Sequence, residues 1–246
     1  MDDLTTGHNP NTNWRLRLAA ADFFFLLNQS YPRATALELV GNRYDLDAAH
    51  RVLLSRGVFC QREALARRGK LKIPAQWRKD LLVVDGHNVQ IAIESHLGGK
   101  PLLQANDGAL RDLAGLSARY RLSETSEVAL DMVVAFLKLF SPREVLFLFD
   151  EPMHRSGELA ANYRKRIAAA GLKGGARTSP VPEREFPDDC VIAGSDRAVI
   201  DSARRWTDMA RLVIDYFGSP EITADFSGFL LARSAKTCVL EGEFPG

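Results

Sequence analysis

The order of the predicted elements assigns this chain to the α/β class, with a mainly parallel sheet flanked by helices behind a small all-helical segment. Two observations predict this fold. From residue 80 onward, short apolar runs alternate with amphipathic stretches, which is the pattern of strand–helix–strand units. Before residue 70, apolar residues recur only at helical spacing. We therefore expect a disordered tail at 1–13, a helical module at 14–69, a basic linker at 70–79 and an α/β domain at 80–246.

The helical module is expected to hold three short helices. Apolar positions predict a helix over Trp14–Asn28, which stops before Pro32 because proline cannot continue it. A second helix follows over Ala34–Val40, and a third over 45–57. Scattered arginines leave two interpretations open: a helix-turn-helix that binds nucleic acid, and a plain helical bundle whose arginines are solvated.

The α/β domain is predicted from apolar runs of strand length and from amphipathic stretches between them. Consecutive apolar residues indicate strands that are buried on both faces of a sheet. The expected strands are Asp80–Asp85, Glu144–Asp150, Cys190–Asp196 and Arg211–Gly218. The expected helices lie around 107–118, at Thr125–Phe140, Ser156–Ala170 and Arg197–Met209, and around 226–235. A polar stretch rich in Gly and Pro, 173–189, is expected to form a loop before the third strand.

The composition favours a soluble cytoplasmic protein. The chain has 246 residues, 46% of them hydrophobic, and 32 Lys and Arg nearly balance 31 Asp and Glu. Residues 1–80 hold 13 basic and 8 acidic side chains, whereas the remainder holds 19 and 23, so the N-terminal part is the basic one. The three cysteines show no CxxC spacing, which favours a reducing compartment. The polar start does not resemble a signal peptide and the FFFLL run is too short for a bilayer, so we expect no membrane partner.

Three of the predicted strands end in an aspartate: LLVVD at Asp85, VLFLFD at Asp150 and VIAGSD at Asp196. Because parallel strands end at the same edge of a sheet, these side chains are expected to lie close together. Like charges at such a distance repel each other, and proteins keep them together mainly where a cation neutralises them. Oxygen ligands favour Mg²⁺ or Mn²⁺ over zinc. We therefore predict a metal site formed by the three aspartates.

Two further residues are candidates for this site. Asn88, three residues after Asp85, could orient a water molecule, although DGHN is also good turn chemistry. Glu127 shares a helix face with Asp131 and lies in a first helical turn, where a carboxylate also suits the helix dipole. His87 is expected to be a turn residue rather than a ligand. The chain lacks DxDx[TV], GxxxxGK[ST], GxGxxG and GxSxG, so haloacid-type phosphatases, nucleotide sites and α/β-hydrolases are unsupported.

Two short motifs resemble those of PIN-like nucleases. VVDGHNV is closest to the NYN branch, in which an aspartate is followed by glycine, one variable residue and asparagine. CVIAGSDRAVID is similar to a later strand of that superfamily, where Ser or Thr precedes an aspartate and a helix follows. The resemblance covers roughly residues 80–218. The stretch 21–59 also resembles a module of unknown function in uncharacterised prokaryotic proteins.

The resemblance implies an activity and a set of site residues. PIN-like proteins are mostly Mg²⁺- or Mn²⁺-dependent nucleases, usually of RNA, with three or four acids at one end of a parallel sheet. By position, it implies metal ligands at Asp85, Asp150 and Asp196, a helix acid at Glu127 and the motif asparagine at Asn88. The superfamily often places another acid at the start of a helix shortly before the later strand. Here Asp188 or Asp189 would substitute from the loop.

Nucleic acid, most simply single-stranded RNA, is the expected partner, and a homodimer is left open. A polyanion needs basic residues near the acidic edge. The candidates, each of which could instead be a solvated surface residue, are Arg111, Arg119, Arg121, Arg164, Lys165 and Arg166. Tyr120 and Tyr163 could stack on bases or pack in the core. Two other functions stay open: a non-catalytic nucleic-acid-binding adaptor and a phosphoesterase that acts on small molecules.

Overall fold

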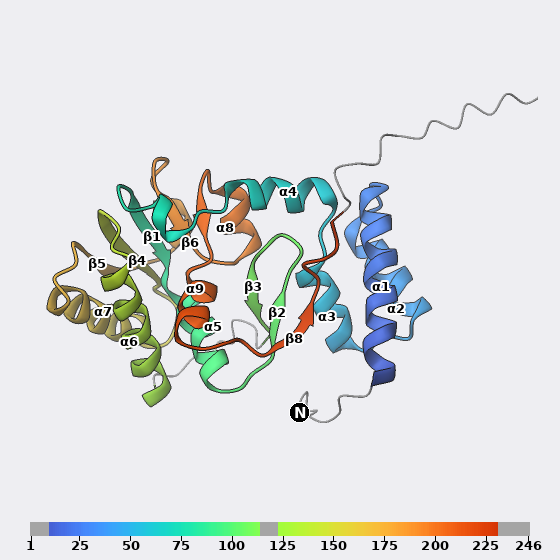
Figure 1. Cartoon of the computed structure of the whole chain (residues 1–246), viewed down its shortest axis with the longest axis horizontal. Coiled ribbons are helices and arrows are strands. Elements are labelled where there is room, and N and C mark those ends of the chain that lie inside the picture. Colours follow the sequence, from blue (N-terminus) through green and yellow to red (C-terminus); the bar gives the residue numbers. More distant parts are fainter. Residues whose placement is uncertain (1–9, 114–122, 231–246) are drawn as a thin grey trace, which may run out of the picture.

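The centre of the molecule is a parallel sheet of five strands in the order β5-β4-β1-β6-β7 (Figure 1). The computed structural model describes residues 10–113 and 123–230. The strands are β1 Leu81–Asp85, β4 Glu144–Asp150, β5 Gly174–Ser179, β6 Val191–Ala193 and β7 Trp206–Thr207. Helices flank this sheet and a helical segment precedes it, so the predicted α/β fold with a mainly parallel sheet is confirmed.

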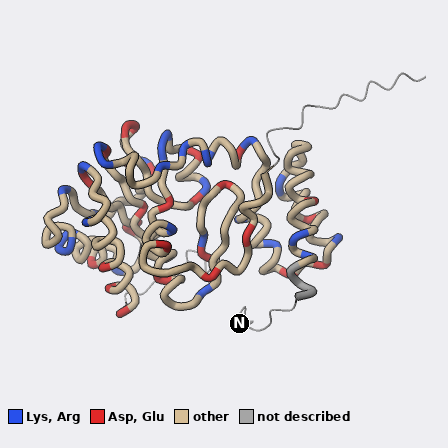
Figure 2. Tube along the Cα trace, viewed as in Figure 1, with Lys and Arg blue, Asp and Glu red and all other residues tan. Residues whose placement is uncertain are grey.

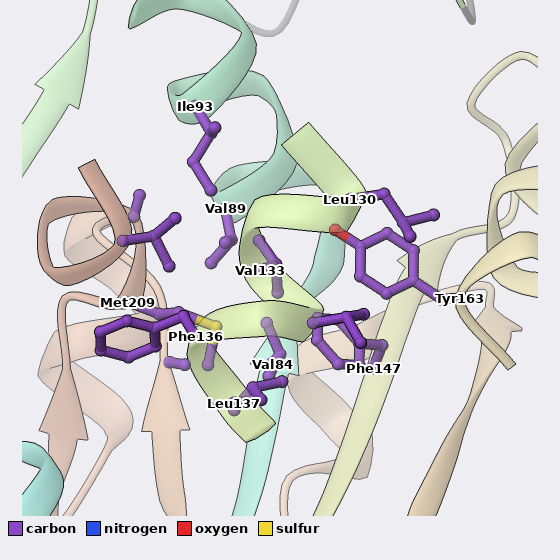
Figure 3. Close-up of a cluster of buried hydrophobic side chains, with 14 of the residues drawn as sticks. Val84, Val89, Ile93, Leu130, Val133, Phe136, Leu137, Phe147, Tyr163 and Met209 are labelled. Atoms are coloured by element: carbon purple, nitrogen blue, oxygen red, sulfur yellow. The ribbon is translucent and has the colours of Figure 1, made fainter. Parts of the chain in front are cut away.

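Both faces of the sheet are buried, because its inner strands place apolar side chains alternately on the two sides. Val84 of β1 points to one face and Val83 to the other. The helices that pack on the first face are α5 Gly86–Leu97, α6 Glu124–Leu139, α7 Ser156–Ala169 and α9 Met209–Phe217. Figure 3 shows Tyr163 in this core beside Phe147, so its ring packs against the sheet rather than on a base. On the second face, the short helix α8 Arg197–Ser202 packs together with Trp206 of β7.

A second sheet joins the α/β domain to the helical module. It has three strands in the order β3-β2-β8, which are β2 Leu102–Gln104, β3 Leu110–Asp112 and β8 Ile222–Asp225. The three predicted module helices are present as α1 Pro10–Asn28, α2 Arg33–Arg43 and α3 Ala48–Gly57. They share one apolar core with Leu103 and Ala224 of the second sheet and with Phe226. The helix α1 begins at Pro10, inside the tail predicted from the sequence.

The helix α4, Gln61–Lys70, connects the module to the α/β domain and does not follow from the sequence patterns. It runs across the top of the view in Figure 1, between α3 and α8. Lys70 at its end donates to the carbonyl of Ile200 on α8 (2.8 Å). The segment 70–79, expected to be a linker, contains the short helix η1 Pro74–Gln76 and is packed against the main sheet. Its backbone N–H at Lys72 donates to the carbonyl of Trp206 (2.7 Å).

Two expectations about single elements of the α/β domain are wrong. The apolar stretch Arg211–Gly218 is not a fourth strand but lies within α9 and the glycine that ends it. Its buried residues recur at helical spacing, and the side chain of Asp208 accepts the N–H of Arg211 as a helix cap. The helix expected over Arg197–Met209 ends at Ser202, and the strand β7 follows it.

Other corrections concern short elements. The region 107–118 contains the strand β3 rather than a helix up to residue 113, and the rest of it lies outside the described residues. The predicted loop 173–189 begins with the strand β5. The helix α5 follows β1 directly, where the sequence patterns predict only a glycine-containing stretch. No helix forms over 226–230, and the remainder of the expected 226–235 helix is not described. None of the described helices combines the length and the apolar character that a bilayer crossing needs.

Candidate functional site

The candidate site lies at the carboxyl ends of the parallel strands. The chain runs from β1 to β4 and β5 on one side and then returns to β6 and β7 on the other. Ligands of open parallel sheets bind where the strand order reverses, which here falls between the ends of β1 and β6. Asp85 is the last residue of β1, and Asp196 follows β6. Asp150 is the last residue of β4, the other neighbour of β1.

Three carboxylates lie close enough to Asp85 at this edge to act on its charge, and we call Asp85, Asp150, Glu183 and Asp196 the acidic rim. Asp85 is its most buried member, with 9% of its surface exposed. Burial raises the pKa of Asp85 from 3.8 to about 7, and the charges of Asp150, Glu183 and Asp196 add to this rise, although a backbone hydrogen bond from Asn88 opposes it. The folded chain therefore holds this proton more tightly than a solvated aspartate does. The structure thus brings together the three aspartates that the sequence singles out.

Asn88 joins the ends of β1 and β6 rather than standing in a loop. It lies in the first turn of α5, and its backbone N–H donates to Oδ1 of Asp85 (3.1 Å). Its side-chain oxygen accepts both the backbone N–H of Ser195 (2.7 Å) and the hydroxyl of Ser195 (3.1 Å). A Cβ on Gly194 would lie 3.3 Å from Cβ of Asp85. The segment after β6 can therefore approach the end of β1 this closely because residue 194 has no side chain. Asn88 is therefore a positioning residue for two strand ends.

His87 is buried beside Asp150 and is more than the turn residue expected from the sequence. Its Nδ1 accepts the backbone N–H of Asp150 (3.0 Å) and lies 3.2 Å from the Oδ2 of the same residue. The imidazole ring meets Phe149 edge-on at 5.2 Å between ring centroids. His87 thus holds the end of β4 at a set distance from α5.

Glu183 is the rim residue that sequence reasoning missed. It lies on the short helix η2, Pro182–Glu185, shortly before β6. The PIN-like pattern of an acid on a helix before the later strand is the signal that points to it, whereas the prediction from the sequence assigns that role to Asp188 or Asp189. The carboxylate of Asp189 instead pairs with Arg205 (2.9 Å).

The rim does not form a ready-made metal cage. Within residues 10–113 and 123–230, no three His, Cys, Asp or Glu side chains are arranged to hold a metal ion. Mg²⁺ usually keeps several waters and is bound by one or two carboxylates together with substrate phosphates, so it does not need such a cage. The donor set of the rim is all oxygen, and the raised pKa of Asp85 marks the place where a cation would relieve repulsion. Asp85 with a neighbouring rim acid fits a water-rich Mg²⁺ or Mn²⁺ site.

Glu127 is engaged with α7. Its carboxylate accepts the side-chain amide of Asn162 (2.9 Å) and pairs with Arg166 (3.0 Å), which also pairs with Asp131. These contacts fasten α6 to α7 on the helical layer that covers the sheet. They also occupy Arg166, one of the candidate residues for nucleic acid.

The remaining nucleic-acid candidates have mixed outcomes. The side chain of Arg111 is buried (4% exposed) and bound to Asp107, and its role in nucleic-acid binding stays a prediction. Arg119 and Arg121 lie outside the described residues. Arg164 and Lys165 are exposed on α7, and Arg164 donates to the carbonyl of Ala176 (2.8 Å).

Comparison with known proteins finds similarity to groups without an assigned activity. Residues 74–212 match the family described as Domain of unknown function (DUF5616), and residues 15–70 match Protein of unknown function (DUF434). The chain is 28% identical over 184 residues to Uncharacterized protein MJ0935 of Methanocaldococcus jannaschii, which covers 75% of this chain and 88% of that protein. No solved structure matches. The resemblance of the N-terminal stretch to an uncharacterised module is consistent with these matches.

Proposed function

The chain belongs to the family described as Domain of unknown function (DUF5616), and from its acidic rim we propose that this member is a Mg²⁺- or Mn²⁺-dependent nuclease that acts on single-stranded RNA. One observation carries the proposal. Asp85 is buried at the strand-order reversal of a parallel sheet, with three further carboxylates close enough to raise its pKa. A cluster of this kind costs stability, and proteins keep such costs mainly at functional sites.

The side chains of the rim would share the work of this reaction. A bound Mg²⁺ or Mn²⁺ supplies an activated water and stabilises charge on the attacking and leaving oxygens of a phosphodiester. Asp85 and an adjacent aspartate, Asp150 or Asp196, would hold the ion. Asn88 and His87 would act as positioning residues, because their hydrogen bonds set the distances between the ends of β1, β4 and β6.

The resemblance to PIN-like nucleases supports the same proposal. The motif VVDGHNV supplies Asp85 and Asn88, which lie together at the first strand end. The later motif supplies Asp196, next to Ser195, whose backbone is bound to Asn88. Glu183, on η2 before β6, would serve as the additional acid that the superfamily often carries before the later strand. Glu127 stays a candidate helix acid, and its part in the reaction would require its ion pair with Arg166 to open.

The test is cleavage of a fluorescently labelled single-stranded RNA in the presence of Mn²⁺. We expect the full-length protein to cleave it, chelation with EDTA to stop the reaction, and Asp85→Asn to lower the rate by at least two orders of magnitude. Asp215→Asn is the matched control, because Asp215 is an exposed partner of Arg211 on α9 and should leave the rate unchanged. Cleavage that survives Asp85→Asn would refute the assignment.

A non-catalytic nucleic-acid-binding adaptor is the second candidate, and the ion pair of Glu127 with Arg166 favours it, because that pair withholds the candidate helix acid from the acidic rim. An adaptor would bind RNA with no cleavage under any metal, and Asp85→Asn would leave its affinity unchanged. A small-molecule phosphoesterase with the same metal site would cleave a simple phosphate ester, and single-stranded RNA would not compete with that substrate.

A further inference from the structure

The helix α1 is apolar on two faces. Its inner face packs into the core of the helical module through five side chains: Leu16, Ala19, Ala20, Phe23 and Phe24. Its outer face carries four further apolar residues that are exposed to solvent, and we call them the outer stripe: Trp14, Leu18, Ala21 and Phe25. Figure 1 shows α1 at the end of the molecule away from the main sheet. A helix that is apolar on both faces is expected to be covered on both, and the described part of the chain covers only the inner face.

The spacing of the outer stripe is that of a seam between two helices. Its members lie four, three and four residues apart, which is the alternation of the a and d positions in a coiled coil. Trp14, Leu18 and Phe25 expose 49%, 47% and 60% of their surface, so each side chain stands out from the module. The next position of the same spacing is Asn28, which is polar and hydrogen-bonded to the backbone of its own chain. The seam therefore ends within α1.

The size of the outer stripe indicates a weak interface. An aromatic side chain buries about 150–250 Å² when it is enclosed, so the exposed parts of Trp14, Leu18 and Phe25 add up to roughly 300 Å² of apolar surface. Apolar patches of this size often mark interaction sites. Two copies of the stripe packed against each other would cover roughly 600 Å², to which flanking residues add, and this is the range of weak contacts. The expected association therefore depends on concentration.

Opposite charges flank the outer stripe on one side. Arg15 and Asp22 are seven residues apart, so they lie on the same side of the seam. The guanidinium of Arg15 lies 5.7 Å from the ring centroid of Trp14, and none of the described residues forms an ion pair with it. Oδ2 of Asp22 accepts the hydroxyl of Tyr44 (2.8 Å) and pairs with Arg43 (3.6 Å). Both contacts use this one oxygen, so a cation and a carboxylate oxygen beside the seam are left for a partner.

These positions match each other in an antiparallel pair of α1 helices. In a two-fold contact, residue i meets residue j of the partner and residue j meets residue i. With the two-fold axis at the middle of the stripe, between residues 19 and 20, Trp14 meets Phe25 of the partner subunit and Leu18 meets the partner's Ala21. On the flank, Arg15 meets the partner's Asp22. Each contact occurs twice, so two ion pairs enclose the apolar seam.

A parallel pair of α1 helices fits the same residues less well. Each stripe position would then meet its own copy, so the centre of the seam would hold one layer of two leucines and one layer of two alanines. The antiparallel pair makes the two central layers alike, each with a large side chain against a small one, which is the better packing. In a parallel pair, Arg17 rather than Arg15 would meet the partner's Asp22.

We propose that the outer stripe is the contact surface between two copies of this chain, which associate through antiparallel α1 helices. The apolar seam supplies the attraction, and the flanking ion pairs set the direction of the helices. The proposal is independent of the proposed nuclease function, because the acidic rim lies on the main sheet and α1 lies at the other end of the molecule. Each copy would therefore keep its own rim accessible in the dimer.

Sedimentation equilibrium of the full-length protein, from about 1 to about 200 µM, measures this association. The apparent mass is expected to rise with concentration from 27.3 kDa toward twice that value. Leu18→Glu should weaken the dimer at least about 10-fold, because it places two charges at the centre of the seam. Leu18 lies outside the core of the module, so this variant should fold, which circular dichroism checks. Leu139→Glu is the matched control, because Leu139 is an exposed leucine (52%) on α6 of the α/β domain and its replacement should leave the mass unchanged.

Exchange of the flanking charges tests the direction of the helices. Arg15→Asp should weaken the dimer about 3- to 10-fold at low salt, and the further change Asp22→Arg should restore it, because the ion pairs form again with their signs exchanged. Arg17→Asp should have no effect. A dimer that Arg17→Asp weakens and Arg15→Asp does not would overturn the antiparallel arrangement.

A chain that stays monomeric at every concentration would overturn the proposal, as would a dimer that Leu18→Glu leaves unchanged. The affinity of the same variants for a labelled single-stranded RNA is measured in parallel. A lower RNA affinity of Leu18→Glu, with the wild type a monomer, would assign the outer stripe to nucleic acid and refute the dimer. Absence of RNA cleavage by a wild type that does dimerise would contradict only the proposed nuclease function.

Discussion

Replacement of Asp85 by Asn should stabilise the protein at neutral and alkaline pH. The free carboxyl of Asp85 has a pKa of about 7 in the folded chain against 3.8 for an unperturbed aspartate, so the folded state holds the proton more tightly than the unfolded state. The contribution of this group to stability is fully present below pH 3.8 and is lost as the pH rises through about 7. Asparagine removes the charge and can still accept the N–H of Asn88 as a helix cap.

The magnitude follows from the size of the shift. A rise of about three pKa units corresponds to about 4 kcal/mol at 1.36 kcal/mol per unit, and this value is an upper limit at pH 8. At pH 5, about one unit above the pKa of the unfolded aspartate, ionisation of Asp85 destabilises the folded state by only about 1.5 kcal/mol. We therefore expect the stabilisation by Asp85→Asn to be about 2 to 3 kcal/mol larger at pH 8 than at pH 5.

Urea unfolding in the presence of EDTA, followed by circular dichroism at both pH values, measures this difference. The buried Asp208, whose pKa burial raises to about 6, is present in both proteins, so its titration cancels in the comparison. Asp215→Asn serves as the control for a surface charge. An Asp85→Asn protein with the same stability as the wild type at both pH values would refute the reasoning, because it would mean that the rim does not oppose ionisation of Asp85.

Three further predictions follow from the same structure. Mn²⁺ at a concentration well above its Kd should raise the melting temperature of the wild type by a few degrees, because an ion that binds only the folded state stabilises that state. The melting temperature of Asp85→Asn should rise by much less. Equal shifts of the two melting temperatures would contradict a metal site at Asp85. Gly86→Ala should lower the free energy of unfolding in urea by about 1 to 3 kcal/mol, because the added Cβ would lie 2.7 Å from Cζ of Phe149. Gly69→Ala is the control: its Cβ meets nothing within 4 Å, so the free energy of unfolding should not fall. Asp107→Asn should cost about 3 to 5 kcal/mol, because it leaves two buried arginines without their shared carboxylate, and a loss below about 1 kcal/mol would show that these charges are solvated.

The elements that follow from the sequence are those whose character is local. The runs that form β1, β4 and β6 are apolar on consecutive positions, so burial on both faces of a parallel sheet can be read from them directly. The helix α9 was harder to recognise, because a short apolar run satisfies both the strand and the helix pattern. Its capping residue, Asp208, is the local feature that favours a helix over a strand for this run.

The candidate site divides in the same way. Asp85, Asp150 and Asp196 each end or follow an apolar run, and the geometry of parallel strands alone places them on one edge. Glu183 stands in a polar stretch with no periodicity, so nothing near it in the sequence assigns it to that edge. Its contribution depends on the packing of η2 beside β4 and β5 at this edge of the sheet.

The amino-acid sequence by itself determined the class of the fold and the aspartates at the strand ends, because both depend on periodicity and on the direction of neighbouring strands. Only the tertiary structure decided which polar groups meet. Asn88 binds Ser195, 107 residues away, and Arg67 binds Asp107, 40 residues away. Arg111, which looks like any surface arginine in the sequence, is buried by such a contact. The physical reason is that burial and pairing of a charge are properties of the assembled chain: the same side chain is solvated or enclosed according to what the rest of the fold places against it.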